Sequence, residues 1–334
     1  MKTLVLGWEE VEKLLPMSEC VEVMKGALKT MARGDVIQPS RTAVVKPDRT
    51  GRLGMMPAYL GDPPLLGVKA VSVFSGNLGT KFESHQGTIQ LFEPEHGKLE
   101  AIVDAGSVTA IRTGAVSAVA TEVLANKNTD SLAILGSGTQ AGIHLEAMLL
   151  HNKKFQSVKV WSRNQENANR FAKRESKRFG IDIQTFDTAE EAVRGADLIC
   201  TTTASTSPIL KGAWLSPGVH INAIGSSFPP FRELDTQAVA KSSFFVDRRQ
   251  SAIEEADDFR IPKSEGVIDD SHIRGEIGEI LIGKIQGRKN KEELTIFKSL
   301  GLAIEDLAAA YHVYKSGLAH NTGTWVELTG ERQL

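Results

Sequence analysis

The stretch Ser131-Leu-Ala-Ile-Leu-Gly-Ser-Gly-Thr-Gln-Ala-Gly-Ile-His-Leu-Glu-Ala-Met-Leu-Leu150 decides the fold, because an apolar run enters a glycine turn and leaves as an amphipathic helix. Gly136, Gly138 and Ala141 have the spacing G-x-G-x-x-A. In a dinucleotide-binding unit the first glycine permits a tight turn, the second lets the backbone approach the phosphates, and the small third residue lets helix and strand pack closely. A second apolar run, Val158 to Ser162, follows where a βαβ unit has its second strand. The stretch therefore predicts a turn that binds a dinucleotide pyrophosphate.

The end of the second run bears on which dinucleotide binds. Enzymes that use NAD usually carry an Asp or Glu there, which accepts hydrogen bonds from the ribose 2′-hydroxyl. This chain has Ser162, Arg163 and Asn164 instead. Arg163 can pair bidentately with a 2′-phosphate, and Ser162 and Asn164 can donate further hydrogen bonds. We expect NADPH to be preferred and NADH to be possible; the alternative is that Arg163 is a solvated loop charge.

Length and composition indicate a soluble enzyme of two domains. The 334 residues exceed what one hydrophobic core usually supports. A net charge of −2, with both signs spread along the chain, predicts neither a nucleic-acid nor a membrane partner. Cys20 and Cys200 lie far apart and show no metal-binding spacing. We expect a cytoplasmic protein with no structural disulfide and no metal.

The chain changes its pattern near residue 125. The first part predicts two helices, at residues 8–15 and 17–33. A mostly antiparallel set of strands follows, at residues 41–46, 52–59, 66–74, 88–93 and 98–104. Ser107 is expected to cap a helix that ends at Leu124. Beyond it, strands near 132–135, 158–162, 181–186, 198–203, 220–225 and 244–246 alternate with helices. This succession predicts an α/β protein with a Rossmann doubly wound parallel sheet beside an α+β unit, which a helix over 304–316 could complete.

Two cations stand in apolar surroundings. Arg112 lies within a small and apolar helical run, 108–120, and Lys69 lies within the apolar run 65–73. A buried cation needs an anion close by, and either an internal carboxylate or the carboxylate of a ligand would serve. Two such cations make a ligand the more plausible anion. Pairing of both cations with the chain's own acids would contradict this interpretation.

Several motifs carry a resemblance to a known family. They are Gly67-Val-Lys69, Ser84-His-Gln-Gly-Thr88, Leu91-Phe-Glu-Pro94, Thr109-Ala-Ile-Arg-Thr-Gly114, Gly136-Ser-Gly-Thr-Gln140, Ile221-Asn-Ala-Ile-Gly225 with Arg232-Glu-Leu234, and Phe297-Lys-Ser-Leu-Gly301. Over essentially its full length the chain resembles the ornithine cyclodeaminase and mu-crystallin family.

The resemblance implies a homodimer, a discontinuous substrate-binding and dimerisation domain (1–115 with 305–334), and an inserted Rossmann domain (116–304). It implies that Arg41, Lys69 and Arg112 hold a substrate carboxylate. We expect Met55 and Met56 to supply apolar walls of the substrate site, Ser227 to form one orienting hydrogen bond, and His85 to line the pocket. The residues it assigns to the cofactor are Thr113, Gly136, Ser137, Gly138, Thr139, Gln140, Ser162, Arg163, Asn164, Thr202, Ala223, Gly225 and Ser299. Direct catalytic roles fall to Lys69 and Ser227.

Two departures from the family pattern decide between activities. Cyclodeaminases of this family carry an Asp where this chain has Ser227 and a Glu where it has Met55. Oxidation of an amino acid begins from an ammonium group, which must lose a proton, so it needs a positioned base. Reduction of a protonated cyclic ketimine needs only a fixed carboxylate, a stacked ring and apolar walls.

We therefore expect NAD(P)H-dependent reduction of Δ1-pyrroline-2-carboxylate or Δ1-piperideine-2-carboxylate to L-proline or L-pipecolate, as in the reductase branch that the chain resembles. The alternatives are an ornithine cyclodeaminase or an alanine-type amino-acid dehydrogenase that uses another base. A protein that binds NADPH and ligand without catalysis is the third hypothesis, since a shared fold does not fix the reaction.

Overall fold

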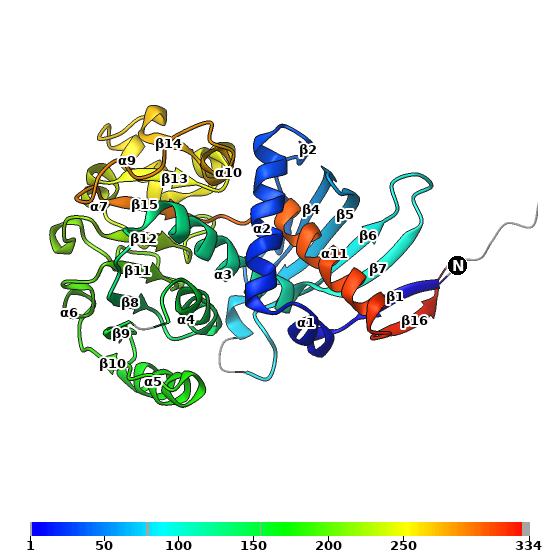
Figure 1. Ribbon diagram of the computed structural model, residues 1–334, viewed down its shortest axis with the longest axis horizontal. Coiled ribbons are helices and arrows are strands. Elements are labelled where there is room, and N and C mark those ends of the chain that lie inside the picture. Colours follow the sequence, from blue (N-terminus) through cyan, green and yellow to red (C-terminus); the bar gives the residue numbers. More distant parts are fainter. Residues whose placement is uncertain (1, 78–79, 154, 329–334) are drawn as a thin grey trace, which may run out of the picture. The chain divides into compact units, whose positions relative to one another are not determined.

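The computed structural model describes residues 2–77, 80–153 and 155–328. The chain divides into two compact units, of which the first is Met1–Arg112 with Leu302–Leu334 and the second is Thr113–Gly301. The second unit is thus an insertion between two parts of the first. Figure 1 shows the two units with their elements labelled.

The first unit is an eight-stranded sheet, counted over the described residues, with helices on one face. Its elements are β1 (Lys2–Leu6), α1 (Trp8–Leu14), α2 (Met17–Ala32), β2 (Val36–Ile37), β3 (Thr42–Val45), β4 (Arg52–Gly61), β5 (Pro64–Val73), η1 (Ser75–Asn77), β6 (His85–Phe92), β7 (Leu99–Asp104), α11 (Ala303–Ala319) and β16 (Thr324–Glu327). The strand order is β16-β1-β7-β6-β5-β4-β2, and β3 pairs with β4. All pairs are antiparallel except β1 with β7.

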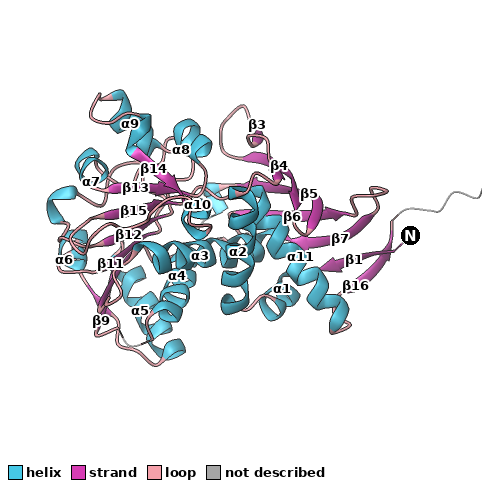
Figure 2. Ribbon diagram, turned by 45° about the horizontal axis from the view of Figure 1, so that its top comes forward, coloured by secondary structure: helices cyan, strands magenta, loops and turns pink. Residues whose placement is uncertain are grey.

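Helix α11 packs against β4, β5 and β6 and against α1 and α2, so the last long helix completes the first unit (Figure 2). Its apolar residues, with those of α2, cover one face of the sheet: Leu28, Met56, Leu60 and Leu307 are all buried. This burial is what holds the two separate parts of the chain in one unit.

The second unit is a wholly parallel sheet of eight strands within the described part of the chain. Its elements are most of α3 (Ala105–Leu124), then β8 (Ser131–Leu135), α4 (Thr139–His151), β9 (Ser157–Trp161), α5 (Gln165–Phe179), β10 (Gln184–Thr185), α6 (Ala189–Val193), β11 (Leu198–Thr201), η2 (Gly212–Trp214), β12 (His220–Ala223), α7 (Thr236–Lys241), β13 (Ser243–Val246), α8 (Arg249–Glu255), α9 (Asp257–Ser264), η3 (Asp270–His272), β14 (Ile273–Glu276), α10 (Ile277–Leu281) and β15 (Thr295–Lys298). The order is β10-β9-β8-β11-β12-β15-β13-β14. The order reverses between β8 and β11, which is where open parallel sheets bind ligands.

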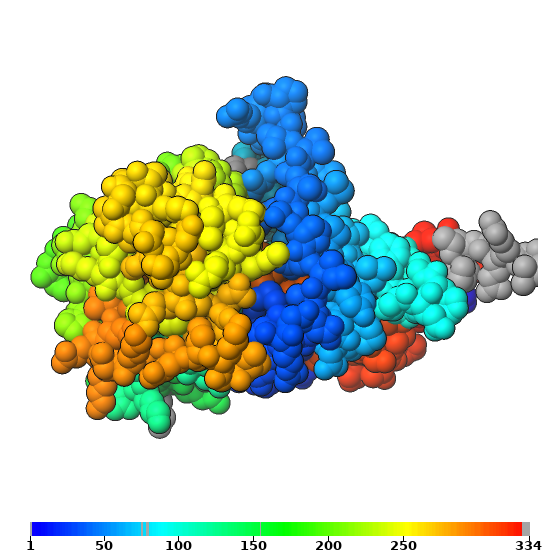
Figure 3. Space-filling model, turned by 90° about the horizontal axis from the view of Figure 1, so that it is seen from above, coloured from blue at the N-terminus to red at the C-terminus, as the bar shows by residue number. Residues whose placement is uncertain are grey.

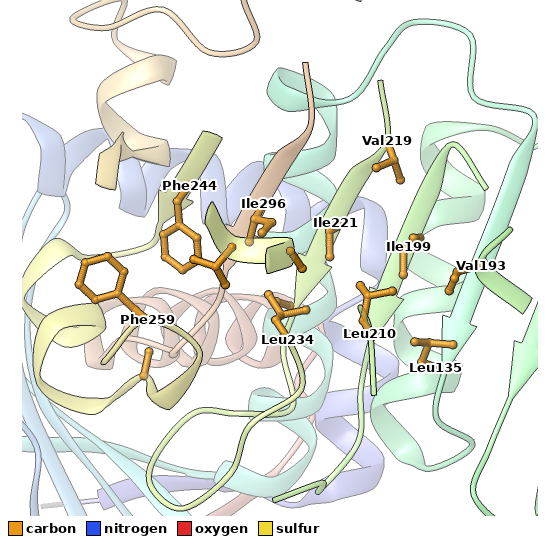
Figure 4. Packing of buried hydrophobic residues seen from close by; sticks show 14 of the residues in the cluster. Leu135, Val193, Ile199, Leu210, Val219, Ile221, Leu234, Phe244, Phe259 and Ile296 are labelled. Carbon is orange, nitrogen blue, oxygen red and sulfur yellow. The ribbon is translucent and has the colours of Figure 1, made fainter. Parts of the chain in front are cut away.

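The core of the second unit explains why its strands are short apolar runs. Residues from five neighbouring strands, among them Leu135, Ile199, Ile221, Ile296 and Phe244, gather on one face under α6, α7 and α9 (Figure 4). A sheet that is covered on both faces needs apolar residues at successive positions, as in β8, where 132–135 are all buried.

The predicted α/β fold is confirmed, and the differences are local. The expected cap Ser107 is wrong: α3 begins at Ala105, and Asp104 Oδ2 accepts a hydrogen bond of 2.7 Å from the Ser107 backbone N–H. Asp104 is thus the residue that satisfies the first turn of the helix. The sequence pattern did not predict β1, β2, β14, β15 and β16, which are only two to five residues long.

Candidate functional site

The turn between β8 and α4 has the geometry that the glycine spacing predicts. Gly136 has a φ of 130°, and a Cβ at this position would lie 2.5 Å from Thr202 Oγ1 and 2.9 Å from the Thr202 carbonyl oxygen. Only glycine fits there. A Cβ at Gly138 would meet no atom within 4 Å, so this side of the turn is open to a close ligand.

The same turn presents backbone donors that no described residue satisfies. The N–H groups of Ser137, Gly138, Thr139 and Gln140 donate to no acceptor in the described ranges. They stand at the N-terminus of α4, a helix of 13 residues whose dipole favours an anion at this end. Adjacent free amides at a helix N-terminus suit the two phosphates of a dinucleotide. The residues present therefore fit a pyrophosphate group.

The loop after β9 contains the three residues that bear on the 2′-position of the ribose. Ser162 Oγ accepts a hydrogen bond of 2.9 Å from Ser137 Oγ, which ties this loop to the phosphate turn. Asn164 caps α5, and its Oδ1 accepts from the Asn167 N–H at 3.1 Å. Arg163 is exposed and makes no hydrogen bond or ion pair with another described residue. Its guanidinium is available to a ligand anion.

Three more cofactor candidates meet at the carboxyl edge of the sheet. Thr202 donates from its N–H to Leu135 O at 2.8 Å and from Oγ1 to the same oxygen at 3.1 Å. Ser299 donates from its N–H to Ala223 O at 3.1 Å. Neighbouring strands β8, β11, β12 and β15 thus bring Thr202, Ala223 and Ser299 to the edge where the phosphate turn lies.

Three further candidates of the second unit take no part in the hydrogen bonds that join Thr202 to Leu135 and Ser299 to Ala223. Thr113 is buried on α3. Gly225 follows β12 and donates its N–H to Glu233 Oε2 at 2.8 Å. Ser227 is half-buried in the loop after β12, and no described residue forms a hydrogen bond with its side chain.

The two buried cations lie together in the first unit, and both are paired with acids of the chain. Lys69 Nζ lies 3.0 Å from Asp306 Oδ2, Arg112 Nε lies 2.9 Å from Asp306 Oδ1, and an Arg112 terminal nitrogen lies 2.9 Å from Glu305 Oε2. All four side chains are at most 5% exposed. The expectation that these cations need a ligand anion for charge balance is wrong, because Glu305 and Asp306 supply two negative charges for two positive ones.

The sequence analysis missed both acids because of their place in the chain. Glu305 and Asp306 are in the first turn of α11, where acidic residues are common because of the helix dipole. Glu305 also satisfies the Leu302 backbone N–H at 3.1 Å. Asp306 is 194 residues from Arg112. The signal that could have found them is two adjacent acids that begin an otherwise apolar helix.

The register of the sheet separates the two candidate methionines. Met56 pairs with Lys69 across β4 and β5, so both lie on the face that α11 covers. His85 is on the same face, because it pairs with Val73 four residues along β5. Met55 points to the opposite face and is 41% exposed. The two methionines therefore do not form one apolar wall.

Comparison with known proteins now identifies the family. The model of the ornithine cyclodeaminase/mu-crystallin family matches residues 1–321. The chain belongs to this family. Mouse ketimine reductase mu-crystallin is 39% identical over 93% of this chain and 96% of its own length, and Δ1-pyrroline-2-carboxylate reductase of Bacillus cereus (strain ATCC 14579) is 34% identical over 97% and 99%.

Solved structures of similar proteins have the same fold. The structure of Thermococcus litoralis Δ1-pyrroline-2-carboxylate reductase with NADH and L-proline has a TM-score of 0.92, at 38% identity over 96% of this chain and 99% of that one. An archaeal alanine dehydrogenase dimer with bound NAD also has a TM-score of 0.92, at 34% identity over 98% and 100%. This member of the ornithine cyclodeaminase/mu-crystallin family is thus an oxidoreductase with a nicotinamide-dinucleotide fold.

Electrostatics around Lys69 follow from its burial. Burial lowers the pKa of Lys69 from 10.5 to about 8, Asp306 counteracts this, and Arg112 and Arg41 lower the pKa further. Asp306 is the one hydrogen-bond partner of the Lys69 ammonium among the described residues, although an ammonium has three donors. His85 is exposed to solvent on one side, yet the atoms packed around its ring, with Lys69 and Arg52, lower its pKa. At neutral pH this family member therefore has a charged lysine beside a neutral histidine.

The remaining expectations concern the thiols and the membrane. Cys20 and Cys200 are both free and buried, as expected. Burial raises the pKa of Cys200 to about 12, so its thiol is unreactive at neutral pH. No helix in the part of the chain that the structure describes is both long and apolar enough to cross a membrane.

Proposed function

We propose that this protein is an NAD(P)H-dependent ketimine reductase, which reduces Δ1-pyrroline-2-carboxylate or Δ1-piperideine-2-carboxylate to L-proline or L-pipecolate. The observation that carries the proposal is full-length similarity to reductases of this one chemistry, from mouse and from bacteria, together with a neighbour that binds NADH and L-proline. The absence of a carboxylate at Ser227 supports reduction over amine oxidation.

The first unit supplies the groups that hold the acid substrate. In the proposal Arg41, Lys69 and Arg112 bind its carboxylate. Because Glu305 and Asp306 already balance two positive charges, this assignment rests on the family motifs and on hydrogen bonding, not on charge. The two donors of Lys69 that no described residue takes up are the strongest support, because an ammonium buried to 3% exposure needs acceptors for all its protons. Asp306 holds Lys69 and Arg112 by its two oxygens and thereby fixes the positions of both cationic groups.

The chemistry asks little of the protein. The imine nitrogen of the substrate already carries a proton, and when bound the reduced nicotinamide supplies a hydride to the adjacent carbon. The C=N π electrons pass to nitrogen, so the neutral amine forms without any base. The proposal gives Met56 the role of an apolar neighbour that excludes water, Ser227 one orienting hydrogen bond to the substrate, and His85 a place beside the carboxylate.

The second unit supplies the residues for the cofactor. The proposal assigns the pyrophosphate to the amides of residues 137–140 with Thr113, and the nicotinamide end to Thr202, Ala223, Gly225 and Ser299. It assigns a 2′-phosphate to Arg163 with Ser162 and Asn164, so that NADPH is preferred over NADH. The exposed guanidinium supports this preference, although the similar structures contain NADH or NAD.

The proposal also includes a homodimer formed by the first unit and a cytoplasmic location. The face of the sheet opposite Lys69, which no helix of the described residues covers, exposes Val44, Leu53 and Met55, each more than 40% exposed. Figure 3 shows the light-blue segment around residue 50, which joins β3 to β4, projecting from its own unit. A contiguous apolar surface of this kind marks an interface. The two free, buried cysteines are consistent with a reducing compartment.

One alternative has an observation in its favour. An alanine dehydrogenase of Archaeoglobus fulgidus is 35% identical over 98% of this chain, so oxidative deamination of an amino acid is the second candidate. It requires a base other than a carboxylate at position 227, and Lys69, with its lowered pKa, is one candidate.

The test is the identity of the product. Purified protein is incubated with each ketimine and with NADPH that carries deuterium at the transferred position, and the amino acid is analysed by chiral chromatography and mass spectrometry. The proposal requires L-proline or L-pipecolate with one deuterium at the α-carbon. Absence of the amino acid from both ketimines would overturn it.

A further inference from the structure

At the carboxyl edge of the parallel sheet lies a carboxylate, that of Glu233, which is fully shielded from solvent. Glu233 is fully buried in the segment between β12 and α7. Its Oε1 accepts hydrogen bonds from the Thr203 N–H at 2.6 Å and from Thr203 Oγ1 at 2.7 Å. Its Oε2 accepts from Thr201 Oγ1 at 2.7 Å and from the Gly225 N–H at 2.8 Å. One side chain therefore joins the ends of β11 and β12.

The buried ion pair of Asp258 and Lys298 holds the backbone of Glu233 in place. Asp258 Oδ1 accepts from the backbone N–H groups of Glu233 and Leu234, at 2.8 and 2.9 Å. Asp258 Oδ2 lies 3.0 Å from Lys298 Nζ, and both of these side chains are fully buried. Burial raises the pKa of Glu233, and Lys298 counteracts this. Because the backbone of Glu233 is itself tied down, its carboxylate has a fixed position from which to bind the two loops.

The chemistry of these contacts requires a carboxylate. All four partners of Glu233 donate, and each oxygen receives one backbone N–H that cannot reverse its direction. If glutamine replaced it, the amide NH2 group would face the Thr203 N–H in one orientation and the Gly225 N–H in the other, so one donor would always face another donor. The fit is also tight, since a Cβ at Gly225 would lie 2.6 Å from Glu233 Oε1.

We propose that Glu233 is the positioning residue for the nicotinamide end of the cofactor, because it fixes the loops that carry Thr202 and Gly225. The inference rests on the cofactor assignment in the proposed function. Among the described residues, the hydrogen bonds of the Glu233 side chain go to Thr201, Thr203 and Gly225 and not to residues 136–140 of the phosphate turn. We therefore expect its effect to be largest at the nicotinamide end, although Thr202 Oγ1 also faces Gly136 of the phosphate turn.

Two ligands separate this role from a general structural one. NADH contains the nicotinamide, whereas ADP-ribose contains only the adenosine, the pyrophosphate and the second ribose. Dissociation constants for both are measured by titration calorimetry on wild-type protein, on Glu233→Gln, and on the control Glu190→Gln. Glu190 is a partly exposed acid on α6 whose side chain pairs with Arg194.

E233Q should raise the Kd of NADH roughly tenfold, because binding must then also order the loops that carry Thr202 and Gly225, and should leave the Kd of ADP-ribose within about twofold of wild type. E190Q should change neither. Equal loss for both ligands, or no loss for NADH, would overturn the proposal. If E233Q does not fold, Thr201→Val, which removes one donor to Oε2, should raise only the Kd of NADH; an unchanged NADH affinity would then contradict the role. Both readouts are independent of ketimine turnover, so they can fail while the proposed reaction stands.

Discussion

Replacement of Asp306 by Asn tests how the buried cations are organised. In the wild type each carboxylate oxygen serves one cation, Oδ2 for Lys69 and Oδ1 for Arg112. The amide has nearly the same shape, yet it has one acceptor and one NH2 group. Whichever way it turns, a donor faces a donor at one of the two cations, and one negative charge is lost.

The magnitude follows from burial. Removing one partner of a buried ion pair costs about 3–5 kcal/mol of unfolding free energy, whereas breaking an exposed pair costs little. Since the amide oxygen keeps one of the two contacts, we expect a loss at the lower end, about 3 kcal/mol. The displaced cation should also hold the substrate carboxylate less well, which raises the KM for the ketimine about tenfold, the equivalent of 1.4 kcal/mol.

The assay combines urea unfolding with steady-state kinetics of Asp306→Asn. Glu22→Gln is the matched control, because it removes the charge of a 71% exposed acid that pairs with Lys25 in the same unit. The control should leave the unfolding midpoint and the KM unchanged, and D306N should leave the KM for NADPH unchanged. If D306N unfolds at the wild-type midpoint with the wild-type KM for the ketimine, the reasoning about this cluster is refuted.

The other predictions concern pH, cofactor and assembly. The folded pKa of Lys69, about 8, lies below its usual 10.5, so between these two pH values the unfolded chain binds more protons and the unfolding free energy rises with pH. The affinity for the inhibitor pyrrole-2-carboxylate, a planar analogue without an imine, should fall above pH 8, because Lys69 then loses its charge. An inhibition constant that stays flat up to pH 9.5 would count against a role of Lys69 in binding the carboxylate. Arg163→Ala should raise the KM for NADPH by about 10- to 100-fold, the loss of a charge-assisted contact, with little effect on NADH, and equal effects on both would disprove the 2′-phosphate assignment. Leu53→Glu on the uncovered sheet face should convert a dimer to a monomer in light scattering, and an unchanged mass would place the interface elsewhere.

How far the sequence predicts this site depends on how local each feature is. The phosphate turn could be predicted because the strand, the two glycines and the helix N-terminus are contiguous, and the amides of residues 137–140 have the geometry that the spacing implies. The pairing of Lys69 and Arg112 could not, because their acids lie on a helix 237 and 194 residues further along the chain, in a first turn where acidic residues are common. A buried cation indicates an anion, but not whether that anion is internal.

The fold shows the same division between local and distant signals. The long amphipathic helices and the apolar strands β4, β5 and β8 were predictable from periodicity. Strand β15 was not, since its four residues end in Lys298, which is buried only because Asp258 receives it. The side chains of Met55 and Met56 could be separated only once the register with β5 fixed which of them shares a face with Lys69.

The most direct test of the proposed function compares the initial rates of ketimine reduction with those of amino-acid oxidation. NADPH oxidation with Δ1-pyrroline-2-carboxylate and Δ1-piperideine-2-carboxylate is measured beside NADP+ and NAD+ reduction with ornithine and alanine, at matched enzyme and near-neutral pH. The proposal predicts that kcat/KM for at least one ketimine exceeds that for either amino acid by more than about a hundredfold, since Ser227 stands where the cyclodeaminases carry a carboxylate base. Ornithine converted to proline with release of ammonia, at a rate above that of both ketimines, would contradict it.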